Sequence, residues 1–168
     1  MGKENRTPVL TGGCQCGAVR YALYVAPQNT HLCHCRMCQK AVGGPFAAFT
    51  GVALEDFAWT RGTPGTFESS ALALRDFCRD CGTPLTFRYR HKGNINVTLG
   101  SLDRPQEVPP KVHYGAESRL PWLDGLDALP ASTTEEDIPA EVRAKLVNYQ
   151  HPDHDTPDDW KTRVGPRG

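Results

Sequence analysis

The sequence lacks the long apolar runs and the excess of one charge that mark several common classes of protein. No part of its 168 residues approaches the roughly 20 consecutive apolar residues that cross a bilayer, and residues 1–8 lack the apolar run of a signal peptide. The 19 Lys and Arg residues balance the 19 Asp and Glu residues, so net charge favours neither nucleic acid nor an anionic membrane as a partner. We therefore expect a cytoplasmic protein without nucleic-acid or membrane partners, and the oligomeric state stays open.

Long stretches with helical periodicity are also scarce, whereas turn-forming residues are frequent. The 16 Gly and 14 Pro residues divide the chain into short segments, which favours strands and turns over long helices. Alternation of apolar and polar residues predicts strands at 19–23, 85–89 and 94–99. The turn-rich residues 61–65 suggest a hairpin connection, and helices are expected only at 38–42 and 139–149. The pattern predicts one mainly β domain with few short helices.

Cysteine, in contrast, is abundant and clustered. All seven cysteines fall into three local groups. These are the pair Cys14 and Cys16, the triplet Cys33, Cys35 and Cys38, and the pair Cys78 and Cys81. Disulfides are rare in a reducing cytoplasm, and seven thiols cannot all pair. The clustering therefore favours metal binding over disulfides, over isolated buried cysteines and over a redox role for the last pair.

The count of cysteines predicts one closed and one open zinc site. Two pairs make a complete four-thiolate site, which is structural, and the remaining triplet leaves a fourth position for water or a ligand. An open position among soft thiolates suits a substrate thiol better than a strongly activated water. His34 can instead complete the triplet, and that would close the second site. A zinc-stabilised interaction module without catalysis is the alternative function.

Several short motifs surround these cysteines and follow one another along the chain. They are Gly13-Cys14-Gln15-Cys16-Gly17, Cys33-His34-Cys35-Arg36-Met37-Cys38-Gln39-Lys40, Gly43-Gly44-Pro45-Phe46, Phe77-Cys78-Arg79-Asp80-Cys81-Gly82-Thr83-Pro84-Leu85, Leu99-Gly100-Ser101-Leu102-Asp103, and the later His113-Tyr114 and Trp122. This series resembles the glutathione-dependent formaldehyde-activating enzyme family, whose domain is shared with centromere protein V. The resemblance covers residues 10–130. Gln39-Lys40 departs from the Arg-Lys that family members commonly carry after the third cysteine of the triplet.

The resemblance implies a small zinc-stabilised β-sheet domain, a β-tent, with few short helices. It also implies which cysteines share a metal: Cys14, Cys16, Cys78 and Cys81 at a structural zinc, and Cys33, Cys35 and Cys38 at a catalytic zinc. The implied activity is that of a carbon–sulfur lyase that joins glutathione and formaldehyde to give S-hydroxymethylglutathione. The implied domain is flanked by an N-terminal tail at 1–9 and by a C-terminal helix and mobile polar tail at 131–168.

Residues near the triplet are candidates for the substrate site. His34 can donate a hydrogen bond beside the second zinc or shuttle a proton, although a histidine in a turn is also often solvent-facing. Arg36 and Lys40 can attract the carboxylates of glutathione. The remaining candidates for contact with the substrate are Phe46, His113, Arg119 and Trp122. In the tail, His151 and His154 are expected to be solvated.

Overall fold

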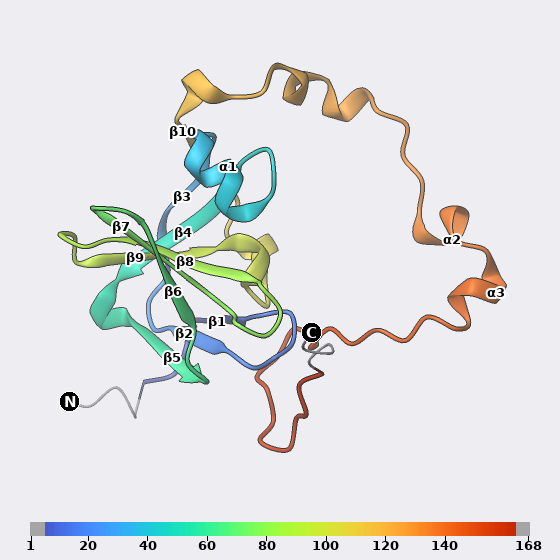
Figure 1. The fold of residues 1–168 in the computed structure, drawn as a ribbon, viewed down its shortest axis with the longest axis horizontal. Coiled ribbons are helices and arrows are strands. Elements are labelled where there is room, and N and C mark those ends of the chain that lie inside the picture. The colour runs from blue at the N-terminus through green and yellow to red at the C-terminus, as the bar shows by residue number, and fades with distance from the viewer. Residues whose placement is uncertain (1–5, 164–168) are drawn as a thin grey trace.

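The computed structural model describes residues 6–163, which form two β-sheets and a long C-terminal excursion (Figure 1). The strands are β1 Leu10–Gly13, β2 Arg20–Leu23, β3 Gln28–Cys33, β4 Ala47–Ala53, β5 Phe57–Arg61, β6 Gly65–Ser70, β7 Ala73–Phe77, β8 Pro84–Tyr89, β9 Asn94–Thr98 and β10 Val112–Tyr114. The α-helices are α1 Arg36–Val42, α2 Thr134–Asp137 and α3 Ala140–Arg143. The fold is therefore mainly β, as the sequence predicts.

The strands divide into a small and a large sheet. The small sheet has the order β1-β2-β5, and the large sheet has the order β10-β3-β4-β9-β8-β7-β6. Neighbouring strands are antiparallel, apart from β10, which runs parallel to β3. The late strand β10 thus lies beside the strand that ends at the cysteine triplet.

The main apolar core contains residues of both sheets. Tyr21 is fully buried and stacks on Phe57 at 5.6 Å between ring centroids, while its hydroxyl lies 2.8 Å from Ser101 Oγ. The same buried cluster includes Leu85 and Val97 of the large sheet, together with Cys14, Cys16 and Cys78. A second, smaller cluster joins Cys38 to Ala47 and Phe49, with Cys33 and Cys35 packed against it. The two cysteine pairs therefore belong to one apolar cluster and the triplet to the other.

Two expectations about local structure are wrong. Residues 61–65 do not close a hairpin: β5 pairs with β2 in the small sheet, whereas β6 pairs with β7 in the large sheet. The residues at 61–65 determine that the chain turns there. Which strand β5 and β6 then pair with depends on how the apolar faces of distant strands pack in the whole domain. The expected helix at 139–149 shrinks to α3, because the segment buries no apolar face and a helix in water needs such packing to extend beyond its costly first turn.

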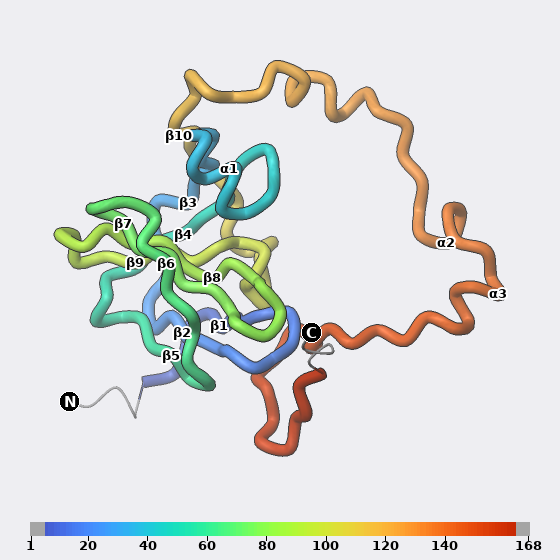
Figure 2. The backbone as a smooth tube through the Cα atoms, in the orientation of Figure 1, coloured from blue at the N-terminus to red at the C-terminus, as the bar shows by residue number. Residues whose placement is uncertain are grey.

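The chain leaves the sheets after β10 and returns near its end. Figures 1 and 2 show this excursion as an extended arc that carries α2 and α3 and comes back to the region of β1 and β2. Thr133 and Glu136 form a capping box that starts α2, but the arc contributes no residue to the core between residues 124 and 150. Within residues 6–163, every helix falls short of the length and apolar character that a membrane crossing requires.

Candidate metal centres

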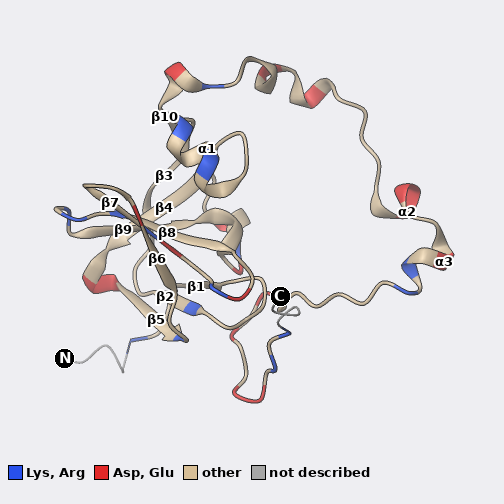
Figure 3. Ribbon diagram, in the orientation of Figure 1, with Lys and Arg blue, Asp and Glu red and all other residues tan. Residues whose placement is uncertain are grey.

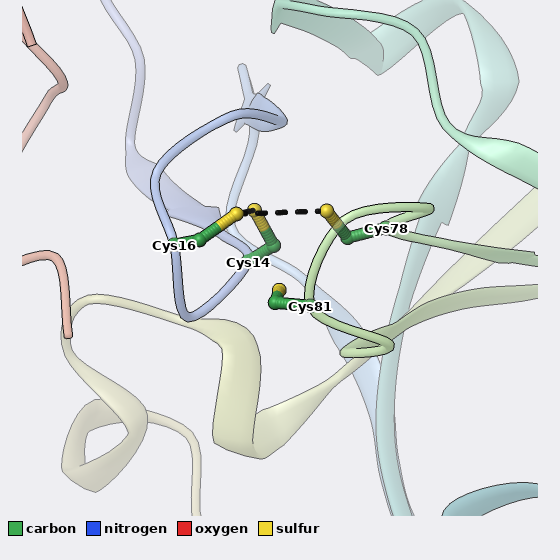
Figure 4. Close-up of side chains that lie close together, drawn as sticks. All are labelled: Cys14, Cys16, Cys78 and Cys81. Carbon is green, nitrogen blue, oxygen red and sulfur yellow. Dashed lines mark hydrogen bonds between the residues drawn. The ribbon is translucent and has the colours of Figure 1, made fainter. Parts of the chain in front are cut away.

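Two turns bring the two cysteine pairs together. Cys14 and Cys16 lie between β1 and β2, and Cys78 and Cys81 lie between β7 and β8. All four sulfur atoms lie within 4.8 Å of one another, and Figure 4 shows the side chains converging from the two loops. Each turn closes with a glycine N–H, at Gly17 and Gly82, that donates a 3.0 Å hydrogen bond to the first cysteine of its pair. Both glycines have positive φ, at 76° and 75°, which side chains other than glycine rarely adopt.

The sulfur geometry fits a tetrahedral metal. Cys16 Sγ lies 3.5 Å from Cys14 Sγ and 3.7 Å from Cys78 Sγ, close to the roughly 3.8 Å edge that Zn–S bonds of about 2.3 Å produce. All seven cysteines are free thiols. Burial raises the pKa of Cys78 to about 11 and also raises that of Cys16, whereas hydrogen bonds from Thr83 act against burial and lower the pKa of Cys81 to about 7. The thiolates of Cys16 and Cys78 therefore need a cation to be stable at neutral pH. The group can hold a metal ion such as zinc.

The C-terminal segment covers this first centre. His151 N–H donates a 2.7 Å hydrogen bond to Gln15 O, and Trp160 Nε1–H donates a 2.9 Å hydrogen bond to Cys16 O. The His151 side chain is only 4% exposed and its ring lies 4.6 Å from that of Trp160. The expectation of a solvated His151 is therefore wrong, because the chain returns from the arc and packs on the Gly17 turn. Nothing local in the sequence indicates this docking.

The cysteine triplet is positioned by one strand end and one helix start. Cys33 is the last residue of β3, Cys35 is the N-cap of α1, and Cys38 lies in the first turns of that helix. Their sulfur atoms also lie within 4.8 Å of one another, and no histidine, carboxylate or further cysteine in the described chain joins them. The group can therefore hold a metal through three thiolates, and no fourth protein ligand comes from residues 6–163.

His34 does not complete this group. Its Nε2 lies 2.8 Å from Nδ1 of His113, the two rings stack at 5.1 Å, and the Phe46 ring lies 5.6 Å away. The His34 side chain is 1% exposed, so it is not solvent-facing. Burial lowers its pKa, and the neighbouring His113 and Arg119 add to the effect. His34, His113 and Phe46 thus form a packed unit behind the cysteine loop.

Arg75, which the sequence did not predict as a site residue, contacts the triplet. Its Nη2 donates to Cys38 Sγ at 3.4 Å, its Nε donates to Ser69 Oγ at 3.0 Å, and its guanidinium lies 4.8 Å from the centre of the Phe87 ring. The hydrogen bond from Cys33 and, against the effect of burial, the contact with Arg75 lower the pKa of Cys38. No local sequence signal identifies Arg75, because its burial and its contact with Cys38 arise only when β7 packs beside α1.

A cavity of about 410 Å³ opens beside the triplet. Its wall includes the three cysteines and the polar or charged residues Asn29, His31, Arg75, Tyr89, Lys92, Asn94 and Tyr114. None of the six predicted substrate residues lines this cavity. Arg36, Lys40 and Trp122 line a separate hollow beside α1, and Arg119 forms a 2.6 Å ion pair with Asp124.

Comparisons with known proteins agree with this architecture. The family model described as "Glutathione-dependent formaldehyde-activating enzyme" matches residues 9–118. A solved structure of a Rhodobacter sphaeroides protein is 23% identical, with a TM-score of 0.50, over 61% of this chain and 98% of that chain. At that identity the likeness shows the fold alone. No protein of curated function matches the chain.

Proposed function

Since the chain belongs to the glutathione-dependent formaldehyde-activating enzyme family, we propose that it is a zinc-dependent enzyme of the carbon–sulfur lyase type that makes or cleaves a thiol adduct. By family membership the default pair is glutathione and formaldehyde, with S-hydroxymethylglutathione as the adduct. The observation that carries the proposal is the cysteine triplet, which has three converging sulfurs, no fourth ligand from residues 6–163, and a cavity beside it.

The two centres have different proposed roles. Cys14, Cys16, Cys78 and Cys81 would hold a structural zinc, because four thiolates fill a tetrahedral shell and three of these side chains belong to the main core. Cys33, Cys35 and Cys38 would hold the catalytic zinc. That zinc, when bound, would supply a positive charge that favours the thiolate form of a substrate thiol.

Arg75 suits this chemistry through its charge. Three thiolates and a divalent cation sum to −1, which disfavours an additional anionic sulfur. The permanently cationic guanidinium at Cys38 brings the local sum to zero. Its hydrogen bond to Ser69 and its position over Phe87 hold it in place. Arg75 therefore lowers the electrostatic cost of bringing a substrate thiolate to the triplet.

The proposed reaction balances without an oxidant. A carbon–sulfur bond forms between the thiol sulfur and the aldehyde carbon, and the proton that leaves sulfur is taken up by the carbonyl oxygen. Cleavage of the adduct reverses both transfers. Lys92 and Arg75 line the cavity and offer cationic partners for the carboxylates of the thiol.

The remaining predicted residues do not line the cavity at the triplet, and we propose indirect roles for them. Arg36 and Lys40 belong to α1, which carries positive charge in Figure 3, and are candidates for contact with a carboxylate at the edge of the site. His34, His113 and Phe46 would position the cysteine loop, because they pack behind it. For Arg119 and Trp122 we propose a role in ordering the segment that follows β10. The catalytic domain would comprise residues 10–130, with residues 131–168 as an added segment.

A zinc count combined with an exchange measurement tests the proposal. We expect two zinc ions per chain, one in Cys35→Ser, and an accelerated interconversion of glutathione, formaldehyde and the adduct by the wild-type protein, seen by NMR exchange spectroscopy. Cys35→Ser should keep its fold and lose the acceleration. Four protein ligands at both metals, or no acceleration by the two-zinc protein, would overturn the proposal in favour of a binding module.

A further inference from the structure

A second, larger cavity adjoins the cysteine triplet on the other side of Arg75. It has a volume of about 560 Å³ and lies between α1 and the strands β6 and β7. Its apolar wall includes Met37, Val42, Phe49, Phe67 and Phe77. Volumes of this order are typical of sites for small organic ligands, which are mostly lined by apolar side chains.

This apolar chamber lies next to the proposed reaction site and shares part of its wall. Met37, Phe49 and Arg75 line both cavities, so they form the boundary between them. Arg75 contacts Cys38 on that boundary. Phe49 and Arg75 are buried, whereas Met37 is half-exposed, so a ligand with its sulfur at the triplet would reach the apolar chamber over Met37.

Two side chains at the chamber are apolar yet exposed. Met37 is 53% exposed and Phe67 is 61% exposed, although both belong to regular elements and line the chamber. Exposed apolar groups around a concave site commonly mark ligand contacts. Arg36 and Lys40 also line the chamber, as does Asp76, whose carboxylate is engaged by Thr66, Thr86 and Arg88. The wall therefore combines an apolar surface with charged groups at its edge.

We infer that the preferred adduct carries an apolar substituent on its carbonyl-derived carbon, as in hemithioacetals of aliphatic or aromatic aldehydes. The inference rests on the proposed function and names its substrate class. Formaldehyde contributes a single carbon and leaves a chamber of about 560 Å³ unused, whereas an alkyl or aryl group fills it. The carboxylates of the thiol moiety remain with Lys92 and Arg75 in the cavity at the triplet, so only the apolar substituent enters the chamber. Bond changes are those of the parent reaction: sulfur bonds to the aldehyde carbon, and the sulfur-bound proton passes to the carbonyl oxygen.

The test uses S-methyl-, S-butyl- and S-hexylglutathione as probes, with affinities measured by calorimetry on the zinc-loaded protein. The alkyl chain of each probe takes the place of the adduct substituent. Each methylene that is fully buried contributes about 0.8 kcal/mol, so affinity should rise by up to about fourfold per methylene. Equal affinity for the three probes overturns the inference.

Two variants locate the gain in affinity. Ala41→Trp fills the chamber from the exposed face of α1, and Phe67→Ser removes part of its wall. In both variants the affinity for the S-alkylglutathiones should increase less with the length of the alkyl chain than in the wild type. Leu72→Ser is the matched control, because Leu72 is 56% exposed in the β6–β7 turn and does not line the chamber. A chain-length dependence that survives in Ala41→Trp would place the alkyl group elsewhere and contradict the inference.

Turnover with two aldehydes separates this inference from the proposed function. With glutathione as the thiol, kcat/KM should be at least tenfold higher for hexanal than for formaldehyde, after correction for the uncatalysed rates. Acceleration with formaldehyde but no preference for hexanal overturns only the apolar substrate class. Absence of acceleration with either aldehyde overturns the proposed function itself.

Discussion

The indole N–H of Trp160 donates a 2.9 Å hydrogen bond to the backbone oxygen of Cys16, 144 residues earlier in the chain. Arg61 adds a hydrogen bond to Pro157 O at 3.0 Å, and Asp155 reaches Arg20 at 3.3 Å. The C-terminal segment is thus fastened to the turn that carries the first cysteine pair. This segment lies outside residues 9–118, which the family model matches.

Gly17→Ala should release the C-terminal segment. A Cβ at Gly17 would lie 2.7 Å from His151 Cδ2 and 2.9 Å from Trp160 Nε1, in addition to the strain of a positive φ. We expect a loss of about 2–3 kcal/mol in stability and faster trypsin cleavage after Lys161. Gly43→Ala is the control, because φ is 66° there and a Cβ meets nothing within 4 Å. Equal behaviour of the two variants would argue against docking.

Cys81→Ser and Cys35→Ser should differ in their effect on folding. Cys81 belongs to the four-cysteine group beside the main core, where a structural zinc commonly contributes about 10–16 kcal/mol of binding free energy. We expect Cys81→Ser, or zinc removal by a chelator, to unfold the domain. Cys35→Ser should keep a cooperative thermal transition within a few degrees of the wild type. Circular dichroism checks both, and equal unfolding would refute the division into structural and open centres.

Arg75→Met should weaken thiol binding at the triplet. A hydrogen bond to a charged group contributes about 1.5–3 kcal/mol, so the Kd for glutathione should rise about tenfold or more. Arg75→Lys should fall between Arg75→Met and the wild type, because it keeps the charge but not the contact with Ser69. Arg88→Met is the control, since Arg88 pairs with Asp76 and does not line the cavity. Unchanged affinity in Arg75→Met would show that the guanidinium is only structural.

Gly115→Ala should disturb the triplet alone. Gly115 has a φ of 62°, and a Cβ there would lie 2.8 Å from the backbone N of Cys35. The neighbouring Tyr114 O accepts a 2.8 Å hydrogen bond from His34 N–H, so this segment holds the cysteine loop. We expect the zinc content to fall from two ions per chain towards one while the fold remains. Gly125→Ala, with no atom within 4 Å, should keep both ions.

Asp103→Asn should destabilise the protein in a pH-dependent way. Burial alone would raise the pKa of Asp103, but hydrogen bonds from Arg20 and Thr11 lower it below its usual value. The contribution to stability is then fully present above the unfolded-state pKa of about 3.9 and is lost as pH falls through the lower folded-state value. Breaking this buried pair costs about 3 kcal/mol at pH 7. Urea unfolding should show that difference at pH 7 and a shrinking difference below pH 4; a constant difference would contradict it.

Features that depend on neighbouring residues were predictable from the sequence alone. The strands predicted at 19–23, 85–89 and 94–99 correspond to β2, β8 and β9 within one residue at each end. They were predictable because successive side chains of a strand point to opposite faces of the sheet, so apolar and polar residues alternate where one face is buried. The spacing within each cysteine group is set by a tight turn, so the two-plus-three-plus-two pattern identifies candidate metal ligands locally. The mainly β class follows from the same local patterns.

The tertiary structure alone decided the relationships between distant segments. Strand pairing places β5 and β6 in different sheets. Arg75 contacts Cys38, 37 residues away, and Trp160 contacts Cys16, 144 residues away. Such contacts form because burying apolar surface and pairing buried charges stabilise one arrangement of the whole chain. A short segment of sequence does not contain the information on which distant residues will be buried or paired together. For this reason the candidate metal ligands could be read from the sequence, whereas the cavity walls and the cation beside the triplet could not.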